Sequence, residues 1–288
     1  MQARSALFDL YGDYLRPRGG YAPVAALVRL LSPLAIAAPA VRTAVSRMVR
    51  QGWLRPTRLP NGAGYALTPK AVRRVDEAAS RIYRIGSPDW DGRFDLVVVE
   101  LPASRTARSR LASTLSYLGY GQLNPTTWLA PRPAAELDSL LAEADVTAER
   151  FAARPTGSAA QPPGIAARPA GVVPEASRLV DRAWDLDELA GAYRGFMADL
   201  GPVVEPVAVV DGDEAGYIAR FRLVHAWRSF LFRDPRLPAE LLPDNWPGDL
   251  AASFFDQHAR RLRPAADRYV EARLAGDTRL TPALRGVL

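Results

Sequence analysis

Apolar residues recur at helical spacing in four segments near the start of the chain. They lie three or four positions apart in 5–15, 23–31, 40–50 and 69–82, and this spacing predicts four amphipathic helices. Between the third and fourth helices, two short strand-like runs flank the turn sequence LPNGAG, a pattern typical of a β-hairpin. A plain helical bundle would need no hairpin. The order helix, helix, helix, hairpin, helix therefore predicts a winged helix-turn-helix domain over residues 1–86.

The pattern changes after residues 84–92, which we interpret as a boundary. RFDLVVVELP is almost continuously apolar and predicts a strand buried on both faces. A helix at 104–118, a glycine-rich turn, the strand TTWLAP and a helix at 133–143 follow. This alternation predicts a small ferredoxin-like α/β sandwich over residues 90–154.

The rest of the chain is mainly helical. Residues 155–174 are rich in Pro, Gly and Ala and predict a linker. The last segment, 175–288, predicts a helical C-terminal domain with helices at 177–199, 213–232 and 248–274. The expected fold class is therefore α+β and multidomain.

The helix expected at 40–50 has two chemically different faces. Val41, Val45, Met48 and Val49 share one side, which predicts the buried face. The other side carries only arginine, threonine and serine, and no acid occurs between Asp13 and Asp76. A solvated helix face usually mixes acids and bases, because i,i+4 ion pairs stabilise it. An inert arginine-lined surface is the alternative, but the pattern favours a face that binds an anion.

The residue types of this polar face are those that recognise DNA. Arginine can contact a guanine edge with two hydrogen bonds, and hydroxyl groups reach bases or phosphates. The N-terminal part of a recognition helix meets base edges in the major groove. The predicted contacts are Arg42, Thr43 and Ser46 at bases, Arg47 and Arg50 at phosphates, and Arg58, Asn61 and Gly62 of the hairpin at the backbone or minor groove.

Several segments together resemble the PaaX family of bacterial transcriptional repressors. They are FDLYGDYLRPRGG, AVRTAVSRMVRQGWL, YALTPKAVRRVDEAASRIYR, WDGRFDLVVVELP and LVHAWRSFLFRDPRLPAELLPDNWPG, in the expected order. The resemblance implies an N-terminal winged helix, a Cas2-like central domain and a helical C-terminal domain. It also implies a homodimer on palindromic double-stranded operator DNA, released by a small-molecule effector such as phenylacetyl-CoA or another acyl-CoA. No cofactor or metal is implied.

A second cluster combines aromatic and cationic side chains. His225, Trp227, Arg228 and Arg233 lie within LVHAWRSFLFRDP. Tryptophan could stack on an aryl group and arginines could bind the phosphates of an acyl-CoA effector. Internal hydrogen bonding by His225 and ion pairing by Arg228 are the alternative that we favour.

Composition narrows the function classes. The chain of 288 residues has a formal net charge of +6, which suits a nucleic-acid partner. It has no cysteine and two histidines, which excludes disulfides, thiolate zinc sites and a histidine-rich metal site. The sequence shows no signal peptide or long apolar run, so we expect a cytoplasmic protein without a membrane partner.

We expect a transcription regulator and not an enzyme. Two alternatives to this interpretation remain open. The Cas2 resemblance suggests one alternative, a metal-dependent nuclease that uses Asp91, Asp95 or Glu100. No acid cluster in the sequence supports a two-metal site. A winged-helix scaffold for protein partners is the other.

Overall fold

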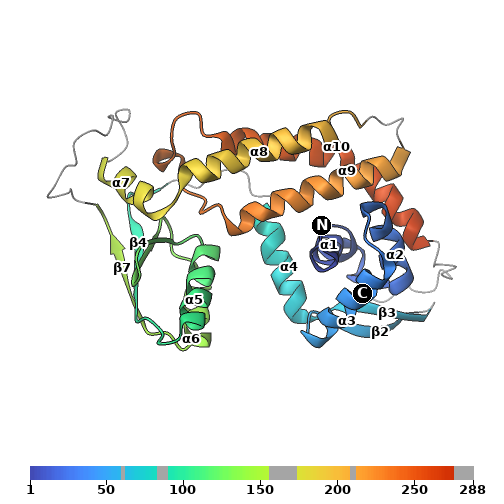
Figure 1. Cartoon of the computed structure of the whole chain (residues 1–288), viewed down its shortest axis with the longest axis horizontal. Coiled ribbons are helices and arrows are strands. Elements are labelled where there is room, and N and C mark those ends of the chain that lie inside the picture. Colours follow the sequence, from blue (N-terminus) through green and yellow to red (C-terminus); the bar gives the residue numbers. More distant parts are fainter. Residues whose placement is uncertain (60–61, 83–89, 156–173, 208–211, 276–288) are drawn as a thin grey trace. The chain divides into compact units, whose positions relative to one another are not determined.

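A computed structural model describes residues 1–59, 62–82, 90–155, 174–207 and 212–275 (Figure 1). Contacts between Cα atoms divide the chain into two compact units, each built from separate stretches of sequence. The first unit contains 1–84, 196–228 and 252–288, and the second contains 85–195 and 229–251. The segment 175–288, expected to form one helical domain, thus contributes to both units. The predicted domain boundaries stay a prediction.

The first unit begins with helices and a small sheet. Helix α1 (Ala3–Leu10) continues through a π-helical turn, Tyr11–Leu15, and a 3-10 turn, Arg16–Arg18. The elements that follow are β1 (Tyr21–Pro23), α2 (Val24–Leu31), α3 (Ala38–Arg50), β2 (Leu54–Leu59), β3 (Gly62–Leu67) and α4 (Pro69–Ile82). The sheet is antiparallel in the order β1-β3-β2. The predicted helices and hairpin lie at these positions.

Strand β1 was not predicted from the sequence. Its three residues pair with Gly64–Ala66 of β3, and a run of three residues is too short to show a strand periodicity. The helical spacing over 23–31 predicts Pro23 in the first turn of a helix, whereas its backbone is extended and it directly precedes α2. Proline suits this edge position because it has no N–H to donate to a neighbouring strand.

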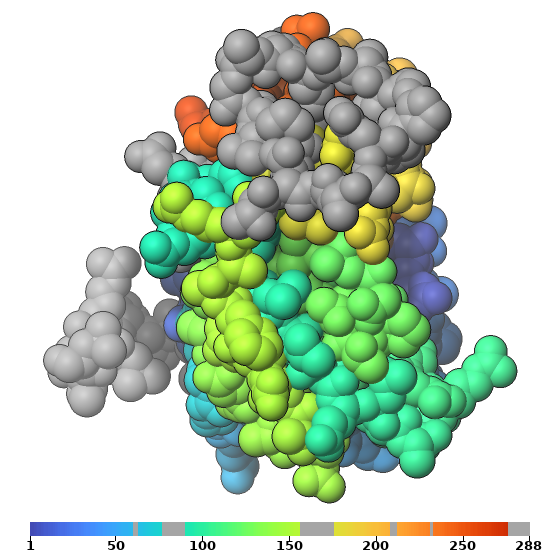
Figure 2. Space-filling model, turned by 90° about the vertical axis from the view of Figure 1, so that its left-hand side faces the viewer, coloured from blue at the N-terminus to red at the C-terminus, as the bar shows by residue number. Residues whose placement is uncertain are grey.

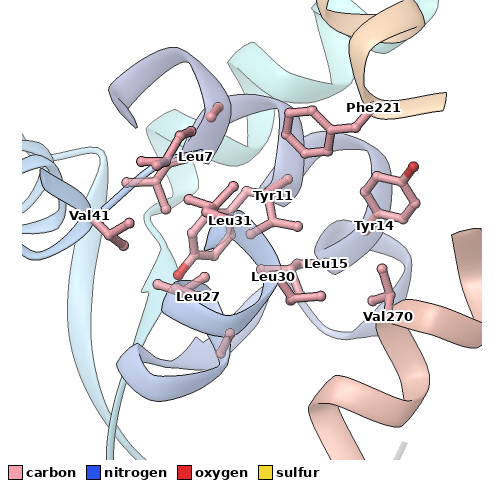
Figure 3. Packing of buried hydrophobic residues seen from close by; sticks show 14 of the residues in the cluster. Leu7, Tyr11, Tyr14, Leu15, Leu27, Leu30, Leu31, Val41, Phe221 and Val270 are labelled. Atoms are coloured by element: carbon pink, nitrogen blue, oxygen red, sulfur yellow. The ribbon is translucent and has the colours of Figure 1, made fainter. Parts of the chain in front are cut away.

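Two helices from the C-terminal part of the chain complete the core of the first unit. These are α9 (Gly212–Trp227) and α10 (Pro247–Ala275). Tyr217, Phe221 and Val270 belong to the same buried cluster as Leu7 and Tyr14 of the N-terminal segment. Figure 3 shows Phe221 and Val270 next to Tyr14. The N-terminal helices therefore share one hydrophobic core with α9 and α10.

The second unit contains an antiparallel sheet in the order β5-β6-β4-β7. Its elements are β4 (Phe94–Val99), α5 (Arg105–Tyr117), β5 (Gly121–Asn124), β6 (Thr127–Ala130), α6 (Leu137–Glu143) and β7 (Ala148–Ala153). In Figure 2 the blue-green of β4 and the yellow-green of β7 lie side by side at the surface. This βαββαβ order and strand arrangement are those of a ferredoxin-like fold.

Helices cover one face of this sheet, and a second cluster lies on the other. Leu111 and Leu115 of α5 pack with Leu137 and Leu141 of α6 against the sheet. The other face meets a cluster that includes residues of α7 (Pro174–Ala183). Strand β7 was not predicted from the sequence, because AERFAA does not alternate between apolar and polar residues. Strand β5 was not predicted either, because it overlaps the glycine-rich segment that we expected to be a turn.

The remaining helices differ in detail from those expected. The helix predicted at 177–199 is two helices, α7 and α8 (Leu186–Val204). Between them the Asp185 side chain accepts a hydrogen bond from the backbone N–H of Glu188 (2.8 Å), which starts α8. The helix predicted at 213–232 ends as α9 at Trp227 and passes into a 3-10 turn, Arg228–Phe232. In the described ranges, none of the helices has both the length and the apolar character needed to cross a bilayer.

Candidate nucleic-acid interface

Backbone geometry fixes where α3 ends and the hairpin begins. Gly52 has a φ of +70°, a conformation that glycine adopts without penalty. The N–H of Gly52 donates to the carbonyl of Val49 (3.0 Å), and that of Trp53 donates to the carbonyl of Met48 (2.9 Å). These two bonds form a Schellman motif, which satisfies the last carbonyls of the helix. The Gly52-Trp53 pair therefore stops α3 and turns the chain directly into β2.

Contacts on both sides hold this junction. The Thr68 hydroxyl donates to the carbonyl of Gly52 (2.7 Å), which ties the start of α4 to the end of α3. The Trp53 ring packs edge-on against Phe8 of α1, with ring centroids 5.2 Å apart. The orientation of α3 is thus set by its neighbours in the first unit.

The two faces of α3 differ in burial as the periodicity predicts. Val41, Val45 and Met48 are buried, Ala44 joins them, and Val49 is half-buried. The five polar residues that the sequence places opposite are all exposed, namely Arg42, Thr43, Ser46, Arg47 and Arg50. The structure therefore brings these five side chains together on one solvent-facing surface, which we call the α3 polar face.

The arginines of the α3 polar face differ electrostatically from other arginines of the first unit. Arg16 pairs with Asp76 at 3.1 Å, and Arg18 pairs with two acids of α10. Among the described residues, no ion pair includes an arginine of the α3 polar face. These guanidinium groups are therefore available to an external anion.

The hairpin next to α3 also carries exposed arginine. Strands β2 and β3 pair from Leu54↔Leu67 to Leu59↔Gly62. Arg58 on β2 is exposed, and Gly62 is the first residue of β3. Asn61, also predicted to contact DNA, lies outside the described residues.

Two carboxylates on the N-terminal helical segment are buried and paired with α9. Arg220, only 1 % exposed, forms an ion pair with Asp13. Its guanidinium also donates to the Tyr14 hydroxyl (3.0 Å) and to the carbonyl of Ala259 (3.1 Å). Asp9, 4 % exposed, lies against the end of α9 and the turn that follows it. Polar contacts therefore reinforce the shared core.

The predicted effector residues His225 and Arg228 meet at Asp9. Arg228 forms an ion pair with Asp9, and Nδ1 of His225 lies 2.5 Å from its Oδ2. Burial lowers the pKa of His225, and a hydrogen bond between the two groups requires Nδ1 to donate, because the Asp9 carboxylate accepts. Both side chains thus have partners inside the protein.

The other two predicted effector residues contact different partners. Trp227 stacks on Phe255, with centroids 4.8 Å apart and planes 11° apart. Arg233 belongs to the second unit, where it pairs with Glu188 at 2.7 Å beside a hollow of about 220 Å³. The role of the four residues in effector binding stays a prediction.

Two of the three acids proposed for a nuclease make hydrogen bonds within the protein. Asp95 accepts hydrogen bonds from Arg150 (3.0 Å) and from the Tyr120 hydroxyl. Asp91 accepts one from the backbone N–H of Arg93 (2.9 Å), and Glu100 is exposed. Within the described ranges, no group of three or more acidic or histidine side chains could hold a metal ion. The geometry does not favour a metal-dependent nuclease.

Comparison with known proteins gives consistent matches along the chain. Residues 2–71 match the family model described as PaaX-like protein, residues 87–163 match the PaaX protein central Cas2-like domain, and residues 184–272 match the PaaX-like protein C-terminal domain. The transcriptional repressor PaaX of Escherichia coli (strain K12) is 31 % identical over 273 residues, covering 92 % of this chain and 82 % of the relative.

A solved structure has the same fold. The uncharacterized protein Rv0674 from Mycobacterium tuberculosis superposes with a TM-score of 0.61 at 21 % identity, covering 93 % of this chain and 98 % of that chain.

Proposed function

The chain belongs to the family of PaaX-like proteins, and from this we propose that it regulates transcription by binding DNA through α3. It is a DNA-binding regulator and not an enzyme. The observation that carries the role of α3 is its polar face, on which three exposed arginines have no acidic partner in the described part of the first unit. Such a surface is complementary to the phosphates and guanine edges of a major groove.

The arrangement around α3 supports a winged helix-turn-helix. Helices α1, α2 and α3 precede the hairpin β2–β3, and β1 adds a third strand to it. In this proposal Arg42, Thr43 and Ser46 read bases, because they lie toward the N-terminal part of the recognition helix. Arg47 and Arg50 contact phosphates, and the hairpin with Arg58 contacts the adjoining backbone.

The mode of regulation is a proposal based on family membership. Because the E. coli relative is named a transcriptional repressor, we propose that this protein represses its targets. It would bind a palindromic operator as a homodimer and be released by an acyl-CoA or a related aromatic metabolite. The sequence candidates for that effector are His225, Trp227, Arg228 and Arg233. The internal partners of His225 and Arg228 favour a structural role for these two.

Footprinting on the DNA upstream of the protein's own gene tests the proposal. Wild type should protect a defined site, and Arg47→Ala, which removes a phosphate contact, should weaken binding about equally on all sequences and reduce the salt slope by about 1. The matched control is Arg222→Ala, which removes an exposed arginine from α9 and should bind like wild type. If wild type protects no sequence at moderate salt, the proposal is wrong.

The effector is tested in the same assay with phenylacetyl-CoA. Loss of protection supports an acyl-CoA effector. Protection that is unchanged by phenylacetyl-CoA and by other acyl-CoAs excludes that effector class, and leaves the assignment of α3 intact.

A further inference from the structure

Helix α5 of the second unit exposes a surface with the same chemistry as the α3 polar face. Its buried side is formed by Leu111 and Leu115, which pack against the sheet. Its solvent-facing side has only arginine, serine and threonine among its polar residues. The exposed residues are Arg105, Thr106, Arg108, Ser109, Arg110, Ser113 and Ser116, and together we call them the α5 polar face.

Acidic residues are missing from the sequence around the α5 polar face, as they are around α3. No Asp or Glu occurs between Glu100 and Glu136. Within the described residues, Arg105, Arg108 and Arg110 take part in no ion pair. Some helical arginines of this chain do pair with acids one turn away. On α10, for example, Arg260 pairs with Asp256, and Arg263 pairs with Asp267 at 3.3 Å. A general excess of arginine therefore does not explain α5.

The placement of these arginines is unfavourable for an isolated helix. Arg105 and Arg108 are three positions apart, where like charges on a helix repel by a few tenths of a kcal/mol. They also lie in the first turn of α5, where the helix dipole already presents positive charge. A polyanion bound at this end would reverse both penalties. A simple solvated face would gain from an acid at one of these positions.

The fold presents the α5 polar face on a fixed support. The Ser104 side chain accepts a hydrogen bond from the backbone N–H of Ala107 (3.4 Å) and caps the helix. The side chains of Leu111 and Leu115 anchor the next two turns. The guanidinium groups therefore extend from a helix whose position in the second unit is set by packing.

We propose that the α5 polar face binds the phosphate backbone of the DNA that α3 reads, beyond the base pairs that α3 contacts. This inference rests on the proposed function, since it needs a DNA-bound protein. Arginine, serine and threonine side chains are the usual donors to phosphate oxygens, and such contacts add affinity without adding sequence information. The protein would thus hold its DNA with two helices, one on each unit, and only α3 would select the sequence.

Salt dependence of binding separates this contact from base recognition. The test variant is R105Q/R108Q/R110Q, in which glutamine keeps the helix propensity of arginine. The control is R182Q/R194Q/R222Q, which removes the same charge from exposed sites elsewhere. Affinity is measured against salt on two duplexes. One covers only the base pairs whose substitution changes the affinity of wild type, which are those that α3 reads, and the other extends it by about two helical turns on each side.

On the extended duplex, we expect the test variant to bind more weakly and with a shallower salt slope. Each lost phosphate contact reduces the slope of log K against log salt by about 0.9, or about 5-fold in affinity at 0.15 M salt. Loss of two contacts gives about 30-fold on the same estimate. The protected sequence should stay the same, and the control should bind like wild type.

Three results would overturn the inference. The first is a test variant with the affinity and slope of wild type on the extended duplex. The second is an equal loss in test and control, which would reflect net charge alone. The third is a loss of equal size on the short duplex, which would place the contact inside the site that α3 reads. A wild type that protects no sequence instead refutes the proposed function.

Discussion

Replacing Arg220 by methionine tests whether α9 belongs to the same structural unit as the N-terminal helices. Arg220 is 1 % exposed and pairs with Asp13, whose side chain is 8 % exposed. It also donates to Tyr14 and Ala259. Methionine approximates the length of the arginine stem, so the substitution removes the charge and the hydrogen bonds with little change in packing.

The expected loss of stability follows from the burial of both partners. Removing one member of a buried ion pair leaves an uncompensated charge and costs about 3–5 kcal/mol. This is a large part of the 5–15 kcal/mol by which a typical domain is stable. We therefore expect Arg220→Met to lower the free energy of unfolding by about that amount. The loss should be smaller for the double variant Asp13→Asn/Arg220→Met than for the sum of the single variants, because no buried charge remains.

Urea denaturation of the full chain, with hydrogen exchange of the α1 and α9 amides, measures this effect. The control is Arg222→Met, two positions further along α9 and exposed, which should change stability by less than about 0.5 kcal/mol. A loss below about 1 kcal/mol for Arg220→Met would refute the reasoning. So would single variants whose effects simply add, since the two residues would then not interact.

Two further predictions concern the N-terminal region. A fragment of residues 1–86 loses five buried partners from α9 and α10, of which the four larger than alanine are each worth about 1.5–3 kcal/mol. It should therefore show no cooperative thermal unfolding. A fragment that melts cooperatively would contradict the shared core. Gly52→Ala should lower the stability of the protein by about 1–2 kcal/mol. Backbone strain alone causes this loss, because an added Cβ at this φ of +70° meets no atom within 4 Å. An unchanged melting temperature would argue against the Schellman motif at the end of α3.

The sequence was sufficient to predict α3 and its chemistry because both are local properties. The periodicity of Val41, Val45 and Met48 identifies the buried face from thirteen consecutive residues. The glycine that ends the helix and the missing acids lie in the same stretch. The same absence of acids also marks residues 101–135. An apolar face opposite an arginine-bearing face, in a segment without acids, therefore identifies the α5 polar face from the sequence as it identifies that of α3.

The association of α9 with the N-terminal helices could not be predicted in this way. Asp13 and Arg220 are 207 positions apart, and neither periodicity nor spacing connects residues so distant. Helix α9 also lacks a clear apolar stripe, since buried residues surround most of it, including Gly216, Tyr217 and Leu223. A helix buried on several sides gives no sign in sequence of which neighbour it packs against.

Burial separates two roles of arginine in the first unit. The carboxylates that precede α3 most closely in sequence, Asp13 and Asp9, lie inside the fold, where Arg220 and Arg228 of the C-terminal part neutralise them. Acids held in this way cannot also pair with the exposed arginines of α3. The buried ion pairs therefore engage the carboxylates that precede α3 in sequence, and Asp76, the first one after it, pairs with Arg16. Stability and anion binding thus depend on different arginines, and substitutions at Arg220 and Arg47 should affect them separately.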